Sequence, residues 1–272
     1  MREREIIANS AMPVTAARIV RDLRALGAEE GDTLLVHASL SSLGWVCGGP
    51  QAVVQALLET VGEAGTIVMP AQSGDWSDPA EWSNPPVPAE WLEAIYRDMP
   101  AFDPLTTPTR GMGRIAELFR TFPGSVRSQH PQASFSANGN HAAAIVADHP
   151  LTPQFGMASP LGKLYGLRNA KVLLLGAGYG ACTAFHLAES LLPDMPAKKM
   201  GTAMTESGAR TWKWFTDFAY DSADFSLIGA VLDERGELPA SGRVGGADCR
   251  LFGLRAGVDA AGEWLRANRI QE

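Results

Sequence analysis

Three short runs of almost unbroken apolar residues are the strongest constraint that this sequence places on its fold. They lie at 33–39 (TLLVHAS), 65–70 (GTIVMP) and 171–175 (KVLLL). Runs of this length are typical of strands that are buried on both faces of a sheet. Apolar residues recur with helical spacing over 14–26 and 50–62, so the first two strands enclose a helix. This order predicts an α/β protein in three layers, in which helices cover a central, mostly parallel or mixed sheet.

Residues typical of helix ends frame the first two predicted helices. Thr15 is a candidate N-cap, Gly27 is a candidate stop, and Pro50 opens the second helix. DMPAKKM (194–200) is predicted to hold no strand. Further helices are predicted near 88–98, 113–121, 140–148 and 222–234, directly after the turn that follows 171–175, and over 255–269. Further strands are predicted at 209–218 and 242–254.

The chain shows no internal repeat and no clear linker, so we expect one domain over 14–272, preceded by an N-terminal tail at 1–13. Within that domain, residues 71–112 differ in composition from the rest. They hold many prolines, several acids and three of the seven tryptophans. Long ordered loops in compact domains are usually functional, and we therefore expect this segment to contact the substrate.

Composition and charge narrow the classes of protein and of partner. The net charge of −7 argues against nucleic acid as a partner and is compatible with a cationic one. Three widely spaced cysteines suit a reducing compartment. Residues 1–13 include acids and no apolar core of a signal peptide, and no run of about 18 apolar residues occurs. We expect a cytoplasmic protein that does not enter the membrane, and homo-oligomerisation stays open.

The stretch KVLLLGAGYGACTAFHLAE (171–189) has two interpretations, a dinucleotide-binding loop or the base of an active site. Gly176, Gly178 and Gly180 give the spacing G-x-G-x-G, whereas the dinucleotide fingerprint is G-x-G-x-x-G. The fingerprint also needs a strand ending in an acid about 20 residues later, where this chain has DMPAKKM. We interpret the glycines as a tight turn between a strand and a helix.

The helix predicted after this turn carries side chains suited to catalysis. Thr183, His186 and Glu189 follow one another at intervals of three, so His186 and Glu189 share a face one turn apart. Open α/β sheets bind ligands just beyond the carboxyl ends of their strands, which is where this helix begins. A single histidine in such a place is more often structural, so this interpretation depends on the remaining stretches.

Polar side chains also gather in three other loops. His37 ends the first strand, and a cluster of serines follows it in a turn whose hydroxyls and N–H groups suit a phosphate or a polar amide chain. TTPTRGMG (106–113) and RSQHPQASFSANG (127–139) add donors that a phosphate-bearing cofactor would use. The candidates are Ser39, Ser41, Ser42, Thr107, Thr109, Arg110, Arg127 and Ser128.

In this order, the stretches resemble the aminoglycoside 3-N-acetyltransferases, also called antibiotic acetyltransferases. The resemblance covers roughly residues 15–265. No R/Q-x-x-G-x-G/A loop is present, so the smaller GNAT acetyltransferase fold is not expected. The matching motifs are DTLLVHASLSSLG, GTIVMPAQSGDWSDP, NPPVP, FDPLTTPTRGMG, FRTFPGSVRSQHPQASFSANG, SPLGKLY, KVLLLG and T-x-x-H-L-A-E.

The resemblance implies transfer of an acetyl group from acetyl-CoA to the 3-amino group of the deoxystreptamine ring of an aminoglycoside antibiotic, which gives resistance. It implies a cationic small-molecule substrate, a direct transfer and no metal. His186 would be the general base and Asp217 its orienting partner, with Asp221 near. Asp75, Glu189 and Asp217 would face the substrate. The residues implied at the coenzyme are His37, Ser39, Leu40, Ser41, Ser42, Thr107, Thr109, Arg110, Gly111, Met112, Gly113, Arg127 and Ser128, with His37 also near the reacting thioester.

The chemistry of the reaction is compatible with these assignments. An alkylammonium group must lose a proton before it attacks a thioester, and a histidine, with an ordinary pKa of about 6.5, can accept that proton. A carboxylate on the second ring nitrogen fixes the tautomer. The tetrahedral intermediate needs a hydrogen-bond donor for its oxyanion, and the hydroxyls or N–H groups of the 39–42 turn are candidates.

Several alternatives stay open at this level. Cys182 lies four residues before His186, where family members often show asparagine, so a covalent acetyl-enzyme with ping-pong kinetics is one alternative. SLL after Glu189 also departs from the family pattern, and the acceptor could be another small amine.

Other classes of protein find less support. A zinc enzyme using His37, His130 and His186 lacks a zinc motif, and a hydrolase lacks G-x-S-x-G. A binding protein without activity would have no need for both His186 and Asp217.

Overall fold

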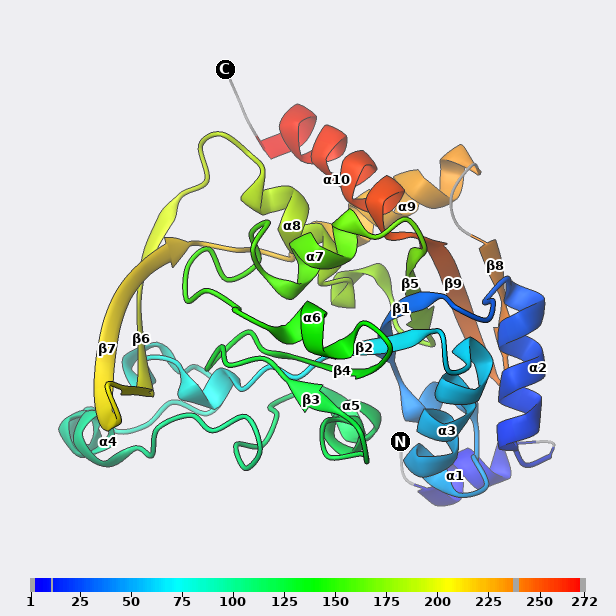
Figure 1. Ribbon diagram of the computed structural model, residues 1–272, viewed down its shortest axis with the longest axis horizontal. Coiled ribbons are helices and arrows are strands. Elements are labelled where there is room, and N and C mark those ends of the chain that lie inside the picture. Colours follow the sequence, from blue (N-terminus) through cyan, green and yellow to red (C-terminus); the bar gives the residue numbers. More distant parts are fainter. Residues whose placement is uncertain (1–2, 11, 237–239, 270–272) are drawn as a thin grey trace.

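The computed structural model describes residues 3–10, 12–236 and 240–269 of the chain. A seven-stranded sheet forms its centre, in the order β3-β4-β2-β1-β5-β9-β8 (Figure 1). Its strands are β1 (Thr33–Ala38), β2 (Thr66–Pro70), β3 (Val126–Arg127), β4 (Phe135–Gly139), β5 (Ala170–Leu175), β8 (Ala240–Val244) and β9 (Ala247–Gly253). β1 pairs in parallel with β2 and β5, whereas β3, β4, β8 and β9 join through antiparallel pairs. The predicted α/β class with a mixed sheet is confirmed.

Helices cover both faces of this sheet and give the three layers expected from the sequence. In β1, Leu34 and Val36 pack with α2, α3 and α5, while Leu35 faces the cluster that contains α6 to α10. This alternation explains why the strand is apolar without interruption. The helices are α1 (Glu3–Ala8), α2 (Ala16–Leu26), α3 (Gly49–Val61), α4 (Leu92–Asp98), α5 (Gly113–Arg120), α6 (Ala142–Val146), α7 (Pro160–Gly166), α8 (Ala184–Ser190), α9 (Phe225–Arg235) and α10 (Leu254–Arg269).

The helix termini predicted from the sequence occur as expected around α2. The Thr15 hydroxyl accepts a hydrogen bond from the backbone N–H of Arg18, and Gly27 ends the helix at a φ of 105°. A side chain strongly disfavours such a backbone conformation, which explains the glycine. In the segment expected as an N-terminal tail, residues 3–8 form α1, and Ser10 accepts a hydrogen bond from the Trp45 amide at 3.0 Å. Residues 1, 2 and 11 of that segment lie outside the described residues.

Two expectations about strands were wrong. DMPAKKM does hold part of a strand, because β6 (Ala197–Glu206) pairs with β7 (Ala209–Phe218) in a hairpin. The turn at Ser207 and Gly208 has positive φ at both residues, as two-residue hairpin turns require. β6 is largely exposed in its first residues, so its apolar pattern was weak. The segment 242–254 was read as one strand, but β8 and β9 form a hairpin around Gly245–Gly246.

The β6–β7 hairpin lies apart from the seven-stranded sheet, at the opposite end of the molecule from α2 (Figure 1). It packs on the long segment 71–112, since Phe102 donates its amide to the Ala203 carbonyl at 3.0 Å. That segment contains three short 3-10 turns before α4, namely Gly74–Trp76, Pro79–Glu81 and Ala89–Trp91. It is therefore ordered chain with little regular structure, as its composition predicts.

Candidate active site

The centre of the sheet brings together loops that are far apart in the sequence. β1, β2 and β5 run in parallel, so their carboxyl ends meet at one edge. From β1, the chain continues to β2 on one side, while β5 lies on the other side. The loops diverge at such a change of direction and leave a crevice, which is where open α/β sheets bind ligands.

A direct contact joins β1 to the start of α8, which follows β5 through a glycine-rich turn. His37, the fifth residue of β1, accepts a hydrogen bond at Nε2 from the Thr183 amide at 2.8 Å. The Thr183 hydroxyl oxygen lies 3.0 Å from the same nitrogen. Burial lowers the pKa of His37 to about 4, so its ring is neutral at neutral pH.

His186 and Glu189 form the pair at the base of the site. Both lie on α8, three residues apart, and His186 Nδ1 is 2.5 Å from Glu189 Oε2. A carboxylate only accepts hydrogen bonds, so in the neutral imidazole the proton lies on Nδ1 and Nε2 keeps its lone pair. His186 lines a cavity of about 320 Å³, and its Nε2 makes no hydrogen bond to the described part of the chain. The arrangement leaves this ring nitrogen open to the cavity.

Glu189 is held from a distant part of the sequence. It is fully buried, and its second oxygen accepts hydrogen bonds from the Asp221 amide at 3.0 Å and from the Arg269 guanidinium of α10. Arg269 is in turn bonded to both oxygens of Asp224. A buried carboxylate is stable in its charged form only with such partners. These hydrogen bonds to Oε1 hold the carboxylate in the orientation in which Oε2 contacts His186.

Aromatic rings hold the His186 imidazole in place. Phe155 stacks on it at 4.7 Å between ring centroids with an interplanar angle of 12°. Phe225 and Tyr220 contact it from other sides, at 4.8 and 5.5 Å. Packing of this kind restricts rotation of the ring and thus fixes the direction in which Nε2 points.

Two further grooves occur in the structure, and the first of them adjoins the His186 cavity. We call the first the serine groove, of about 480 Å³; it shares Ala38, Gly111 and Met112 with the cavity and is also lined by Ser39, Leu40, Ser41, Trp45 and Arg114. We call the second the tryptophan groove, of about 930 Å³. It is lined by Asp75, Trp76, Glu81, Trp82, Trp91, Asp98 and Arg110 together with apolar residues of 84–100.

The loop 106–113 forms the wall between the cavity and the serine groove. Its threonines line neither space. The Thr107 hydroxyl accepts from the Asp103 amide at 3.0 Å, and the Thr109 hydroxyl donates to Glu117 at 2.6 Å. These contacts anchor the loop, and Gly111 and Gly113, with φ of 73° and 84°, expose its backbone to the groove.

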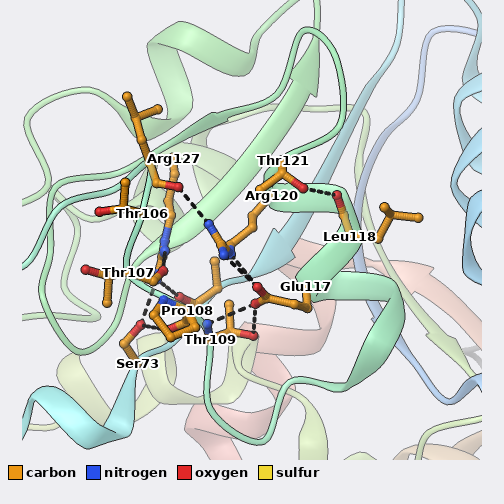
Figure 2. Close-up of polar contacts among 12 residues, drawn as sticks. Ser73, Thr106, Thr107, Pro108, Thr109, Glu117, Leu118, Arg120, Thr121 and Arg127 are labelled. Carbon is orange, nitrogen blue, oxygen red and sulfur yellow. Dashed lines mark hydrogen bonds and ion pairs between the residues drawn. The ribbon is translucent and has the colours of Figure 1, made fainter.

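Arg127 and Ser128 were expected at the coenzyme, and the structure places both in the protein interior instead. Arg127 donates to the carbonyls of Ala71 and Thr107 at 2.5 Å and to the Ser73 hydroxyl at 2.8 Å (Figure 2). The Ser128 hydroxyl contacts His149 Nδ1 at 2.9 Å. The guanidinium therefore holds the loops after β2 and around residue 107 together.

The predicted pairing of Asp217 with His186 was wrong. The Asp217 carboxylate accepts hydrogen bonds from the Thr152 hydroxyl at 3.1 Å and the Gln154 amide at 2.9 Å. Burial raises its pKa, against the effect of these hydrogen bonds. Asp217 belongs to the separate β6–β7 hairpin, whereas Glu189 lies one helical turn from His186. Glu189 is fully buried and contacts His186, so it does not face a substrate as the sequence predicted.

The other predicted residues take several positions. Arg110 and Asp75, expected at the coenzyme and the substrate, pair with each other at 3.3 Å in the tryptophan groove. The Ser42 hydroxyl donates to Ser39 at 2.8 Å, and the serines of 39–42 line grooves outside the His186 cavity. They are therefore poorly placed as oxyanion donors beside His186.

The structure also locates the residues of two alternatives, a covalent route through Cys182 and a zinc enzyme. Cys182 lines the cavity but is fully buried, and burial raises the pKa of its thiol to about 12. His130 bonds backbone groups of Gln132, Ala133 and Leu151, so it does not join His37 and His186.

None of the helices in the described part of the chain combines the length and apolar character needed to cross a membrane.

An α/β sheet with a carboxylate-held histidine facing a cavity at its parallel carboxyl edge has the layout of a ligand-binding site. The family model for aminoglycoside 3-N-acetyltransferases matches residues 35–266. The chain belongs to this family. The enzyme class implied by the resemblance, N-acetyltransferase, is thereby confirmed.

Relatives of known structure and sequence agree with this assignment. The SPbeta prophage-derived aminoglycoside N(3')-acetyltransferase-like protein YokD of Bacillus subtilis is 46% identical over 97% of both chains, and its crystal structure superposes with a TM-score of 0.96 over 99% of both. Aminoglycoside N(3)-acetyltransferase VII of Streptomyces paromomycinus is 37% identical over 97% of this chain and 96% of its own. A structure described as AAC-IIIb binary with CoASH is 31% identical, with a TM-score of 0.82 over 94% of this chain and 97% of that one.

Proposed function

We propose that this protein transfers the acetyl group of acetyl-CoA directly to an aminoglycoside antibiotic in the cytoplasm, at the 3-amino group of the deoxystreptamine ring. The observation that carries the proposal is the His186–Glu189 pair, which leaves Nε2 free to accept a proton at a cavity. General-base catalysis of this kind contributes about 10²–10⁴-fold in rate. Acetylation removes a positive charge from the antibiotic and so accounts for resistance.

The serine groove is the proposed site of the coenzyme. It meets the His186 cavity at Ala38, Gly111 and Met112, so a thioester arm lying in the groove would end beside the base. A family member that is 31% identical is described with CoASH bound, which supports acetyl-CoA as the cosubstrate. The backbone of the two glycines of loop 111–113 can approach a pantetheine amide closely because no Cβ intervenes.

The tryptophan groove is the proposed site of the acceptor. Indole rings provide faces on which a sugar or a cation can pack, and three acids supply negative charge. Each acid is held by a basic side chain in the absence of ligand: Asp75 by Arg110, Glu81 by Lys198 and Asp98 by Arg97. These pairs are half-exposed and weak, so ammonium groups of the acceptor can replace the protein cations.

Thiol release from acetyl-CoA tests the proposed function. Purified protein should release coenzyme A thiol with aminoglycosides that have a free 3-amine, and the release should be absent with those in which this amine is blocked. Release with simple amines alone would assign the protein to another acceptor. Absence of release with every amine would contradict the function.

Arg114 should contribute more to coenzyme binding than Arg110, although the sequence favoured Arg110. Arg114 lines the serine groove, whereas Arg110 lies in the tryptophan groove and is paired with Asp75. We expect Arg114→Ala to weaken coenzyme A binding about tenfold, which is about 1.4 kcal/mol. Arg110→Ala should weaken it less. Titration calorimetry with coenzyme A on both variants tests this order. If Arg110→Ala weakens binding more than Arg114→Ala, the coenzyme lies in the tryptophan groove instead.

Cys182→Ala should keep most of the acetyl-transfer rate. At a pKa of about 12 the thiol is almost entirely protonated at neutral pH and is a poor nucleophile. Mass spectrometry of the intact protein after incubation with acetyl-CoA alone should show no acetyl adduct. A thioester trapped on Cys182, together with an inactive alanine variant, would establish the covalent route instead.

A further inference from the structure

The contact between His37 and Thr183 contains a buried nitrogen without a partner. His37 Nε2 accepts the Thr183 amide and therefore carries no proton. The proton of the neutral ring must then lie on Nδ1, which is buried and makes no hydrogen bond within the described residues. Leaving a buried donor unpaired costs about 1–3 kcal/mol, so an arrangement that keeps one is a candidate for a functional role.

The same geometry leaves the Thr183 hydroxyl proton weakly held. The hydroxyl oxygen is 3.0 Å from His37 Nε2, but this nitrogen has one lone pair in the ring plane, and the Thr183 amide already occupies it. The hydroxyl proton can therefore turn to a stronger acceptor that enters the cavity. The amide contact remains in place during that turn, so the oxygen does not have to move.

Thr183 is also close to the proposed base. It precedes His186 by three residues, and both line the same cavity of about 320 Å³. Besides the two histidines and the Cys182 thiol, the other side-chain donors that line this cavity are Gln72 and Ser222. Ser222 is exposed to solvent, and the Gln72 side chain makes no hydrogen bond within the described residues, whereas Thr183 is held through its own amide. Oxyanion stabilisation depends on donors that are fixed in advance.

We propose that the Thr183 hydroxyl donates the hydrogen bond that stabilises the oxyanion of the tetrahedral intermediate, and that His37 is the residue that positions it. This assignment rests on the proposed acetyl transfer. It replaces the 39–42 turn, which lines other grooves, as the source of the donor.

The reaction balances with these groups. His186 Nε2 takes one proton from the ammonium, and the free amine nitrogen attacks the thioester carbon. As the C–N bond forms, the carbonyl π electrons move to oxygen, to which Thr183 then donates. When the carbonyl re-forms, the C–S bond breaks and coenzyme A leaves as thiolate. Of the two protons lost from the ammonium, one reaches this thiolate through His186 and one passes to solvent.

Three variants of Thr183 and His37 test the assignment by thiol release. Thr183→Val keeps the shape and removes the donor, so kcat should fall about 10²–10³-fold, as for the loss of one oxyanion donor. Thr183→Ser should retain kcat within about tenfold of the wild type. His37→Leu should lower kcat while the KM for acetyl-CoA stays within about threefold, and His37→Gln, which can still accept the Thr183 amide, should recover part of the loss.

The pH profile separates a donor from a structural residue. In Thr183→Val the acid limb of kcat should stay where it is in the wild type, since the base is untouched. If the acid limb of Thr183→Val lies at a different pH, the substitution displaces His186. If its kcat is within threefold of the wild type, the hydroxyl is not needed. Either result, or a larger loss in Gln72→Leu than in Thr183→Val, overturns the proposal. Absence of thiol release in the wild type as well would contradict the acetyl transfer itself, and with it the donor.

Discussion

Replacing His186 by alanine should lower kcat by at least about a hundredfold and leave coenzyme A affinity nearly unchanged. The imidazole is the only described base that lines the cavity with a free, unprotonated ring nitrogen, because His37 Nε2 accepts the Thr183 amide. Loss of a general base costs about 10²–10⁴-fold in rate. His186 does not line the serine groove, so coenzyme binding measured by calorimetry should persist.

The pH dependence gives this prediction a second readout. The wild-type rate should fall on the acid side, because protonation of His186 Nε2 removes the lone pair that accepts the substrate proton. That acid limb should be absent from the residual activity of His186→Ala. If the variant keeps both a near-normal kcat and the acid limb, His186 is a structural residue. His37 would then be the candidate general base.

Glu189→Gln should have the second largest effect, and it should lower both kcat and the free energy of unfolding. An amide can turn its NH₂ group toward Nδ1, which then becomes the acceptor and moves the ring proton to Nε2, where it blocks the base. Loss of the orienting carboxylate in a histidine–carboxylate pair costs up to about 10⁴ in kcat in the serine-protease case. We expect about 10²–10⁴ here. Arg269 also loses a charged partner, which should lower the free energy of unfolding by about 1–3 kcal/mol.

Asp217→Asn is the matched control for Glu189→Gln. Both carboxylates are buried, but Asp217 contacts Thr152 and Gln154 and not His186. The control should therefore lower kcat less than tenfold, even if urea denaturation shows a loss of stability. A larger loss of kcat in Asp217→Asn than in Glu189→Gln would restore the pairing predicted from the sequence.

The sequence predicted the central fold because the physical signals are local there. Buried parallel strands are continuous apolar runs, and Thr15 and Gly27 mark the ends of α2. β6 was missed because a hairpin that stands away from the core needs little apolar surface, and its first residues include two exposed lysines. The turn between β8 and β9 was missed because two glycines in a short segment do not distinguish a hairpin from a bend.

The site was predicted in part. The spacing of His186 and Glu189 placed both on one face of a helix, but it did not show which of them meets solvent. Glu189 is buried because Arg269, 80 residues later, covers and neutralises it. The donors of Arg127 looked available for phosphate, yet Ala71, Ser73 and Thr107 use them. Both errors come from long-range contacts that no local pattern encodes.

The contact between His37 and Thr183 also lacked a sequence signal. The two residues are 146 positions apart and meet only because β1 and β5 are neighbours in the sheet. The sequence predicted the oxyanion donor in the 39–42 turn because three serines lie there. A parallel pairing of the two apolar runs places His37 beside Leu174, but Thr183 follows the glycine-rich turn after β5, which this pairing does not position.

NMR identification of the acetylated nitrogen tests both the proposed acceptor group and the role of His186 in acetylating it. An aminoglycoside with several amines is incubated with acetyl-CoA and either the wild-type protein or His186→Ala, and the product is examined for the position of the new amide. We expect a single product acetylated on the 3-amine of the deoxystreptamine ring, formed by the wild type and at least about a hundredfold more slowly by the variant. Acetylation at another nitrogen, or equal product from both proteins, would contradict this expectation.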